Sequence, residues 1–147
     1  MFNKRVRVAG IYIENDSILL VKHKKENKEY YLLPGGAQED FETLENALKR
    51  EWLEELSLEI SIGELAFIGE SIPPVNSKKN HILQVVFQIN SIDGSIKVNP
   101  DGILYDYEWV PVKKIKDILL FPDCYNQIEN KISNKSADMY QKYNWLD

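Results

Sequence analysis

The chain has 147 residues, of which 44% are apolar and 28% charged, enough for one globular domain, residues 1–147, with a real hydrophobic core. Its formal net charge of −5 provides no general attraction to nucleic acid or to anionic membranes. Composition therefore argues against a nucleic-acid-binding or membrane protein and leaves a nucleotide-sized ligand open.

The first segment, MFNKRVRVAGIYIENDSILLV, predicts a hairpin rather than a secretory leader. Residues 5–13 alternate and are rich in β-branched side chains, Asn15-Asp16 is typical of a turn, and residues 17–23 return as a second strand. No small-residue cleavage site follows. No run of the chain approaches the ~20 apolar residues of a membrane helix.

The remaining elements alternate between short strands and two helical stretches. Residues 30–34 predict a short strand, and Pro34-Gly35-Gly36 predicts a turn. Helices are expected at residues 43–56 and, more weakly, after Pro122, and strands at residues 58–71, 81–90 and 105–112. This order predicts an α+β fold in which helices flank a mixed, mostly antiparallel sheet.

Glutamates continue the apolar stripe of the helix expected at residues 43–56. At about 100° per residue, Glu51 and Glu55 fall on the line of Leu44 and Leu48, and Glu54 lies beside them. Carboxylates three and four positions apart repel one another. A cation should therefore lie among them, and at least one carboxyl should have a raised pKa.

Two interpretations of this acidic cluster remain open. Pairs such as Arg50 with Glu54 are ordinary salt bridges of a solvated helix. A divalent cation such as Mg²⁺ would also relieve the repulsion, because hard ions take oxygen ligands and keep waters in place for a substrate phosphate. The Gly35-Gly36 turn favours the second interpretation, since an exposed backbone carbonyl there can join a metal shell.

Residues 36–58 resemble the box of the Nudix hydrolases. The box has Gly, Glu, Arg-Glu, Glu-Glu, a second Gly and an apolar residue at fixed spacing, and the matching positions here are Gly36, Glu42, Arg50-Glu51, Glu54-Glu55, Ser57 and Leu58. Ser57 replaces the second glycine, where a left-handed residue ends the helix, so we expect it to cost about 1 kcal/mol. The segments YYLLPGG and EWVPVKKI also resemble family segments.

This resemblance implies the Nudix α/β/α sandwich and a metal-dependent hydrolase. In such an enzyme, water attacks one phosphorus of the pyrophosphate in a nucleoside diphosphate that is linked to another moiety. The resemblance implies Mg²⁺ or Mn²⁺ as cofactor. Glu51, Glu54 and Glu55 match the metal-binding glutamates, and the Gly35 carbonyl matches a backbone ligand.

By the same resemblance, Glu51, Glu54 and Arg50 form the catalytic set. Arg50 and Glu42 match an ion pair that holds the loop to the helix and whose value lies in orientation. Gly36 and Tyr31 are predicted to contact the substrate. The general base stays open between Glu54 and an acid from a later loop, for which the candidates are Asp101, Asp106 and Glu108.

Several other side chains have two interpretations. Tyr30 and Tyr31 could stack on a base or fill the core. The lysines at positions 22, 24 and 25 could meet phosphate or only line a solvated loop. His23 and His81 lack metal-ligand spacing, which favours surface or hydrogen-bonded roles.

The C-terminal part of the sequence carries less information. Cys124, the single cysteine, cannot form an internal disulfide, which predicts a packed thiol and a reducing compartment, the cytoplasm. The tail with Trp145 is either a homodimer contact or a loose end.

The substrate is the least determined feature. Pro74 lies sixteen positions beyond Leu58, which resembles the proline of ADP-ribose-type members, although Pro73-Pro74 is also a rigid turn. ADP-ribose, another nucleotide sugar, nucleoside triphosphates and dinucleoside polyphosphates all stay open. A Nudix-fold sensor that binds nucleotides without cleaving them is the alternative function, but a sensor has no need for all three metal-binding glutamates.

Overall fold

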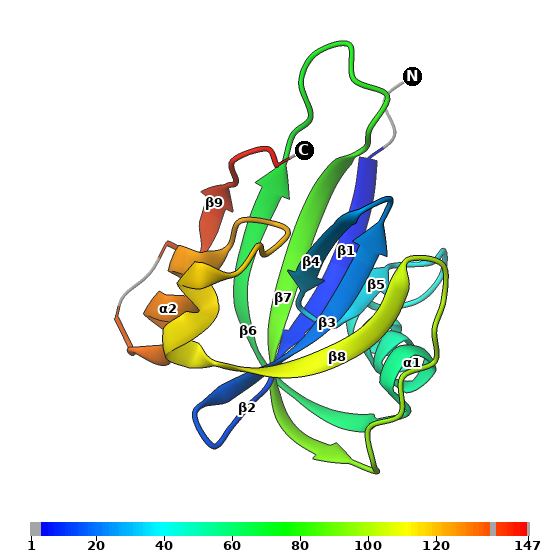
Figure 1. The fold of residues 1–147 in the computed structure, drawn as a ribbon, viewed down its shortest axis with the longest axis vertical. Helices are drawn as coiled ribbons and strands as arrows, with labels where there is room; N and C mark the ends of the chain where they lie inside the picture. The colour runs from blue at the N-terminus through cyan, green and yellow to red at the C-terminus, as the bar shows by residue number, and fades with distance from the viewer. Residues whose placement is uncertain (1–3, 136–137, 147) are drawn as a thin grey trace.

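The computed structural model describes residues 4–135 and 138–146, in which helices flank two sheets. The strands are β1 (Lys4–Ile11), β2 (Ile13–Glu14), β3 (Ser17–Lys25), β4 (Lys28–Leu32), β5 (Gly35–Ala37), β6 (Glu59–Ser71), β7 (His81–Asp93), β8 (Leu104–Pro111) and β9 (Tyr140–Lys142). The helices are α1 (Leu44–Leu56), the 3₁₀ helix η1 (Val112–Asp117) and α2 (Tyr125–Ile132). Figure 1 shows α1 and α2 at opposite sides of the strands.

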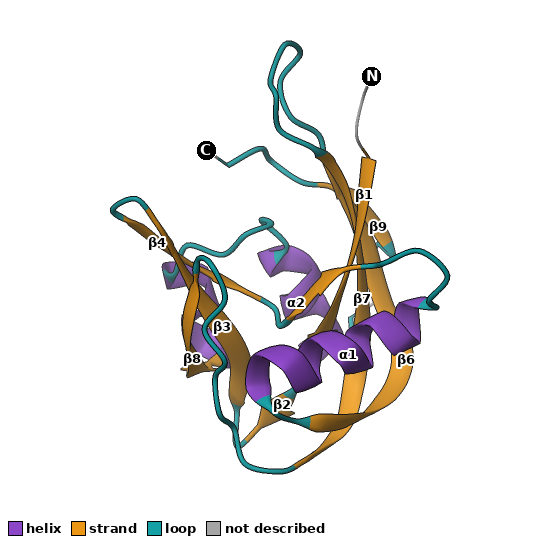
Figure 2. Cartoon of the chain, turned by 90° about the vertical axis from the view of Figure 1, so that its right-hand side faces the viewer, coloured by secondary structure: helices purple, strands orange, loops and turns teal. Residues whose placement is uncertain are grey.

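The larger sheet is mixed and has the strand order β5-β1-β7-β6-β9. β1 runs parallel to β7 and antiparallel to β5, while β6 runs antiparallel to β7 and parallel to β9. The second sheet is antiparallel, with β3 paired to β2, β4 and β8. Figure 2 shows the two groups of strands side by side, with α1 running across them. The predicted α+β fold with a helix-flanked mixed sheet is confirmed.

The predicted N-terminal hairpin forms only at its tip. β2 pairs with the start of β3 across Asn15 (φ 51°) and Asp16 (φ 61°), both left-handed as tight hairpin turns require. β1 instead joins the larger sheet beside β7, which corrects the expectation that residues 5–13 pair with residues 17–23. The physical reason is burial, because the end of β1 from Val8 to Ile11 is buried on both faces and needs covering layers that a lone hairpin lacks.

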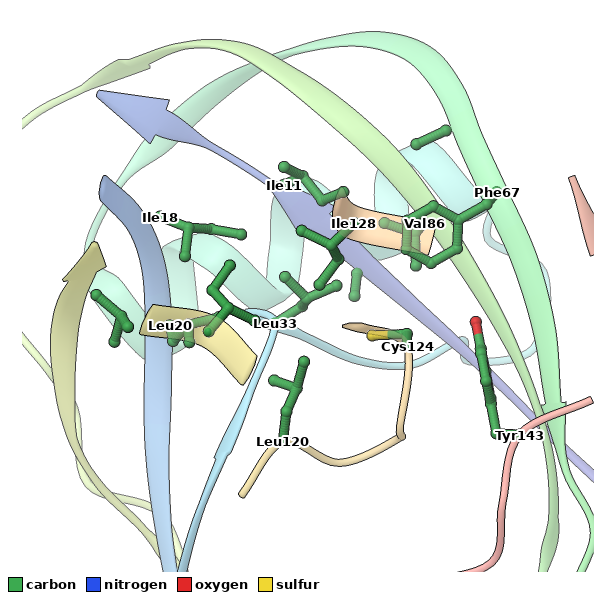
Figure 3. Close-up of a cluster of buried hydrophobic side chains, with 14 residues drawn as sticks. Ile11, Ile18, Leu20, Leu33, Phe67, Val86, Leu120, Cys124, Ile128 and Tyr143 are labelled. Carbon is green, nitrogen blue, oxygen red and sulfur yellow. The ribbon is translucent and has the colours of Figure 1, made fainter. Parts of the chain in front are cut away.

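Two buried clusters hold the layers together. Figure 3 shows the cluster on the α2 side, where Ile11, Ile18, Val86 and Ile128 meet. The other cluster lies under α1 and contains its buried side chains Ala47, Leu48, Trp52 and Leu56. The Trp52 indole N–H also donates to the Pro34 carbonyl at 3.0 Å, which fixes α1 against the Pro-Gly-Gly segment.

The C-terminal region contains the predicted helix, α2, and two elements that the pattern did not predict, η1 and β9. β9 has only three residues and is fixed by tertiary contacts. Tyr143 directly follows β9, and its hydroxyl donates to Gln127 Oε1 at 2.5 Å. The Gln127 side chain in turn donates to the Ile68 carbonyl of β6. Cys124 is buried, and burial raises the pKa of its thiol to about 12, as expected of a packed, unreactive thiol. Across the described ranges, we find no helix with the length and apolar character to span a membrane.

Candidate active site

Helix α1 presents the acidic cluster along the edge of its buried face. Thr43 caps the helix by accepting a hydrogen bond from the Asn46 amide at 3.0 Å, so the helix begins within one residue of the prediction. The Glu51 side chain is 15% exposed and the Glu54 side chain 59% exposed. The cluster therefore runs from the protein interior to the surface.

Arg50 ties three segments together. Its Nη2 and Nε donate to both oxygens of the Glu42 carboxylate, at 2.7 and 3.1 Å, which confirms the predicted pair. Nη2 also donates to the Ala37 carbonyl at 3.1 Å. The bond to Glu42 raises the pKa of Arg50 and lowers the pKa of Glu42, so both stay charged and keep the loop before α1 fixed to the helix and to β5.

The remaining face of the Arg50 guanidinium contacts two cluster carboxylates. Nη1 lies 2.8 Å from Glu51 Oε1 and 3.3 Å from Glu54 Oε2. Over residues 4–135 and 138–146, no three His, Cys, Asp or Glu side chains are gathered closely enough to hold a metal ion. Because Arg50 draws Glu51 and Glu54 toward itself, a cation would have to share or exchange these carboxylates with the guanidinium.

Glu55 is the cluster member without a full set of partners. Its Oε2 atom is buried and has no hydrogen-bond partner among the described residues. Burial raises the pKa of Glu55 to about 8, the charges of Glu51 and Asp101 act in the same direction, and Arg7 opposes them. Burial is a larger cause of this shift than the repulsion between glutamates that the helix spacing predicts. A buried carboxylate oxygen that lacks a donor is suited to a cation.

Gly36 makes room for Glu51. A Cβ atom at Gly36 would lie 2.3 Å from the Glu51 carboxyl carbon and 2.5 Å from each carboxylate oxygen. Only glycine therefore lets the carboxylate rest against the backbone of β5. This observation gives Gly36 a positioning role in the structure.

The carbonyl of Gly35 faces the same edge of β5 as the carbonyl that Arg50 contacts. The Gly10 amide donates to the Pro34 carbonyl, and the Gln38 amide to the Val6 carbonyl, each at 3.0 Å. Antiparallel ladders alternate, so the carbonyls of Gly35 and Ala37 point away from β1. The three carboxylates of α1 and this carbonyl are hard oxygen donors of the kind that Mg²⁺ and Mn²⁺ take, but among the described residues the carboxylates are not gathered around one point.

The loop between β7 and β8 caps the end of α1, a feature that sequence reasoning missed. The Lys97 amide donates to the Leu56 carbonyl at 3.0 Å, and the Asn99 amide donates to the Glu55 carbonyl at 2.9 Å. The Asn99 side chain donates to the Glu54 carbonyl at 2.7 Å. These bonds satisfy carbonyls that a helix end leaves unpaired. They also bring Asp101 toward the cluster, where its charge raises the pKa of Glu55.

The chain is similar to known proteins over most of its length. The family model that describes the NUDIX domain matches residues 4–130 of the chain. The chain belongs to the Nudix domain family. An ADP-ribose pyrophosphatase of Methanocaldococcus jannaschii is 35% identical to it over 98 residues, which are 66% of this chain and 57% of that protein. The match thus spans little more than half of the relative's length.

Solved Nudix structures have the same fold. A MutT protein from Methanosarcina mazei superposes with a TM-score of 0.74 at 20% identity, over 92% of this chain and 98% of that one. A Nudix hydrolase from Nitrosomonas europaea superposes with a TM-score of 0.72 at 22% identity, over 93% of this chain and 94% of that one. At such identities the likeness concerns the fold alone.

The other candidate residues lie in several places on the Nudix fold. The Tyr31 hydroxyl donates to Glu108 at 3.2 Å, and Lys22 lies 3.7 Å from the same carboxylate. Asp106 accepts a bond from the Tyr107 amide, and His81 contacts Glu70. Among the three late acids, Asp101 is the one whose charge acts on Glu55. His23 packs edge-on against Tyr30.

Ser57 occupies the left-handed conformation predicted for the second box glycine, with φ 61° and ψ 30°. The structure also gives its side chain a role that the sequence did not. The Ser57 hydroxyl donates to the Lys97 carbonyl at 3.0 Å and accepts from the Asn99 side chain at 3.1 Å. These contacts offset the backbone strain, so we now expect less gain from a glycine there.

A second strained residue, Phe41, precedes the helix. It has φ 68°, unusual for a bulky side chain, and the side chain is fully exposed at 109%. We expect Phe41→Gly to raise the free energy of unfolding by about 1 kcal/mol, because strain is removed and no buried contact is lost. Ser57→Gly should change it by less than about 0.5 kcal/mol, because relief of strain is offset by two lost hydrogen bonds. Urea unfolding of both variants measures the two changes in the free energy of unfolding. A larger increase from Ser57→Gly than from Phe41→Gly would contradict this expectation.

Proposed function

We propose that the protein is a metal-dependent pyrophosphohydrolase that cleaves a nucleoside diphosphate linked to another moiety. The observation that carries this proposal is the acidic cluster on α1, in which Glu55 has a buried oxygen without a partner among the described residues and the Glu51 carboxylate rests against Gly36 of β5. Family membership and the relative described as an ADP-ribose pyrophosphatase support it.

This proposal assigns roles to the residues of the site, and Glu54 has two of them. Glu51, Glu54, Glu55 and the Gly35 carbonyl would hold Mg²⁺ or Mn²⁺. When bound, the metal neutralises the diphosphate and lowers the pKa of the attacking water. Glu54 extends furthest into solvent, with 59% of its side chain exposed, and accepts the proton of that water as general base. Asp101 is the second candidate for the base, because its charge acts on the cluster.

Arg50 and Gly36 position the site. Arg50 keeps Glu42, β5 and α1 in fixed relation through its bonds to Glu42 and to the Ala37 carbonyl. Gly36 leaves the space that the Glu51 carboxylate occupies. Because these contacts are made without substrate, the site is preorganised to orient the substrate.

For the substrate, we propose ADP-ribose or another nucleotide sugar ahead of nucleoside triphosphates. The support is the 35% identity to a protein described as an ADP-ribose pyrophosphatase. Pro74 adds little, because its carbonyl accepts from the Ser77 amide at 2.9 Å in an ordinary turn. That turn lies at the far end of the strands from α1 in both views (Figures 1 and 2).

The alternative is a Nudix sensor that binds nucleotides without cleaving them. The partly buried Glu55 argues against it, since a carboxyl with one oxygen kept from water at an energetic cost is unnecessary for a site that only binds. We also propose a cytoplasmic location, consistent with the single, unpaired and buried Cys124. The homodimer contact through the tail stays a prediction.

Saturating Mg²⁺ or Mn²⁺ should raise the melting temperature, because an ion that binds only the folded protein stabilises it. At one hundred times the dissociation constant, the gain is about 2.7 kcal/mol. Differential scanning fluorimetry in EDTA and in increasing Mg²⁺ measures it, and Glu55→Gln should reduce the shift. A melting temperature that is equal in both conditions would contradict the metal site.

The activity is tested with a panel of substrates in Mg²⁺ and in EDTA. The panel contains ADP-ribose, UDP-glucose, ATP, GTP and diadenosine tetraphosphate, with products separated by ion-exchange chromatography. We expect ADP-ribose to yield AMP and ribose 5-phosphate only in Mg²⁺. Binding of these compounds with no cleavage in either Mg²⁺ or Mn²⁺ would favour the sensor.

A further inference from the structure

The loop before α1 holds an aromatic side chain in water. The Phe41 side chain is 109% exposed, and its backbone has the left-handed φ of 68°, which is costly for a bulky residue. The loop is fixed around it, because the Glu42 carboxylate accepts from Arg50 and the Glu42 carbonyl accepts from Gln38. None of the described residues covers the Phe41 ring. The fold therefore presents an apolar ring to the outside at an energetic cost.

Acidic side chains accompany this ring. Glu39 and Asp40 directly precede Phe41 and are exposed, and residues 38–42 contain three acids and no base. The Glu39 side chain is 69% exposed and lies 3.8 Å from Arg50, so it is only loosely paired. We call residues 39–41 the Phe41 tip. Its surface combines one apolar ring with negative charge.

A groove of the opposite character lies in the loop between β6 and β7, and we call it the Pro-Pro groove. Its volume is about 700 Å³, and residues 72–80 form most of its walls. Ile72, Pro73, Pro74 and Val75 give it an apolar wall, and Val75 is 90% exposed. An apolar cavity of about 150 Å³ already holds a benzene ring, so the groove has room for a phenyl side chain.

Lysines surround the apolar wall of the Pro-Pro groove. Lys4, Lys78 and Lys79 line it, and residues 72–81 contain no acid. Lys78 is exposed, whereas Lys79 lies over the Trp145 ring, 5.7 Å from its centroid. The groove is thus a basic region on a chain whose formal net charge is −5. A matching partner is apolar at its centre and acidic at its rim.

The Phe41 tip and the Pro-Pro groove lie at different positions along the strands. The loop with the groove projects beyond the ends of β6 and β7, whereas the segment with the tip joins β5 to α1 (Figures 1 and 2). The tip therefore does not reach the groove of its own chain. Two copies that lie side by side in opposite directions bring each tip to the groove of the other copy, as a two-fold axis requires.

We propose that the Pro-Pro groove binds the Phe41 tip of a second copy of this chain, in a two-fold symmetric dimer. The Phe41 ring packs on Val75 and the two prolines, and Lys78 meets Asp40 at the rim. An aromatic anchor in a pocket with a polar rim is the usual centre of an interface. One phenyl ring buries about 150–250 Å², and a standard interface buries about 800 Å² per partner, so we expect a weak dimer that dissociates on dilution.

Sedimentation velocity over about two orders of magnitude in protein concentration tests the dimer. The protein should change from monomer to dimer as its concentration rises. A monomer at every concentration would overturn the proposal. A series of species larger than a dimer would overturn it as well, because the contact would then form an open chain instead of closing. The measurement needs neither metal nor substrate, so its result is independent of the proposed function.

Two substitutions test the apolar contact. Phe41→Gly and Val75→Asp should each weaken dimerisation by about tenfold or more, because each removes apolar surface from the centre of the contact. Both side chains are exposed in the single chain, so both variants should keep the fold, which circular dichroism checks. Unchanged dimerisation in both variants would reject the proposal, because the dimer would then use another surface. Loss of the dimer only together with loss of the fold would also reject it.

A charge exchange tests whether Lys78 and Asp40 meet. Lys78→Glu and Asp40→Lys each place like charges across the contact and should weaken dimerisation by about 3- to 10-fold. The double variant restores opposite charges and should dimerise within about threefold of the wild type. Lys114→Glu makes the same change of charge on η1, outside the groove and the tip, and should leave dimerisation unchanged. A double variant that dimerises no better than the single variants would reject this pairing and with it the proposed contact.

Discussion

Glu55→Gln is expected to lower kcat by about two to three orders of magnitude without unfolding the protein. Glutamine keeps the size of the side chain but removes the charge that would hold the metal. The fold should tolerate it, because burial already raises the pKa of Glu55 to about 8 and penalises the charged form. Steady-state kinetics in Mg²⁺ and circular dichroism measure the two effects.

In the metal-free protein, Glu55→Gln should also change how the stability depends on pH. Because the folded pKa of Glu55 is raised from 4.5 to about 8, its contribution to stability is present below 4.5 and is lost as the pH rises through 8. Wild-type melting temperature in EDTA should fall over this interval more steeply than that of Glu55→Gln. Equal slopes would show that Glu55 is not held in the interior.

Glu45→Gln is the matched control for Glu55→Gln. Glu45 lies in the first turn of the same helix and is exposed, so its loss removes only a favourable interaction with the helix dipole, about 0.3–1 kcal/mol. Activity should remain close to that of the wild type. Equal, small losses of activity in both variants would show that the cluster is an ordinary set of surface salt bridges.

Arg50→Lys is expected to have the largest effect on the architecture of the site. Lysine keeps the charge but cannot reproduce the fork that bonds both Glu42 oxygens and the Ala37 carbonyl. We expect a loss of about 2 kcal/mol in the free energy of unfolding, because several charge-assisted hydrogen bonds are removed. The kcat should fall as well, because the loop before α1 is no longer fixed. Urea unfolding and steady-state kinetics measure these changes.

Arg5→Lys is the control for Arg50→Lys. Arg5 lies on β1 and is exposed, so lysine there should change the free energy of unfolding by less than about 0.5 kcal/mol. If Arg50→Lys were as harmless as Arg5→Lys, the guanidinium would not organise the site.

The helix and its acidic face could be predicted from the sequence because the signals are local. The 3.6-residue period marks the buried side of α1, and fixed spacing places Glu51, Glu54 and Glu55 relative to it. The left-handed Ser57 follows from its position at the helix end. Each of these features depends on residues within about one or two turns of the helix.

Features that depend on distant residues could not be predicted. The pairing of β1 with β7 joins residues 77 positions apart, from Lys4 with His81 to Ile11 with Gln88, and strand alternation alone does not choose a partner. The same is true of the contacts of Asn99 with α1, which lie in a segment that reads only as a loop.

Isotope incorporation tests the central claim most directly. The preferred substrate of the panel is turned over in Mg²⁺ in water enriched in ¹⁸O, and the products are analysed by mass spectrometry. If the acidic cluster directs water to a phosphorus of the pyrophosphate, one ¹⁸O atom should appear in the phosphoryl group of one product, and the rate should fall by two to three orders of magnitude in Glu55→Gln. If the ¹⁸O appeared in a hydroxyl group of the sugar, water would have attacked carbon instead of phosphorus. Incorporation of ¹⁸O at an equal rate in EDTA would contradict the metal dependence.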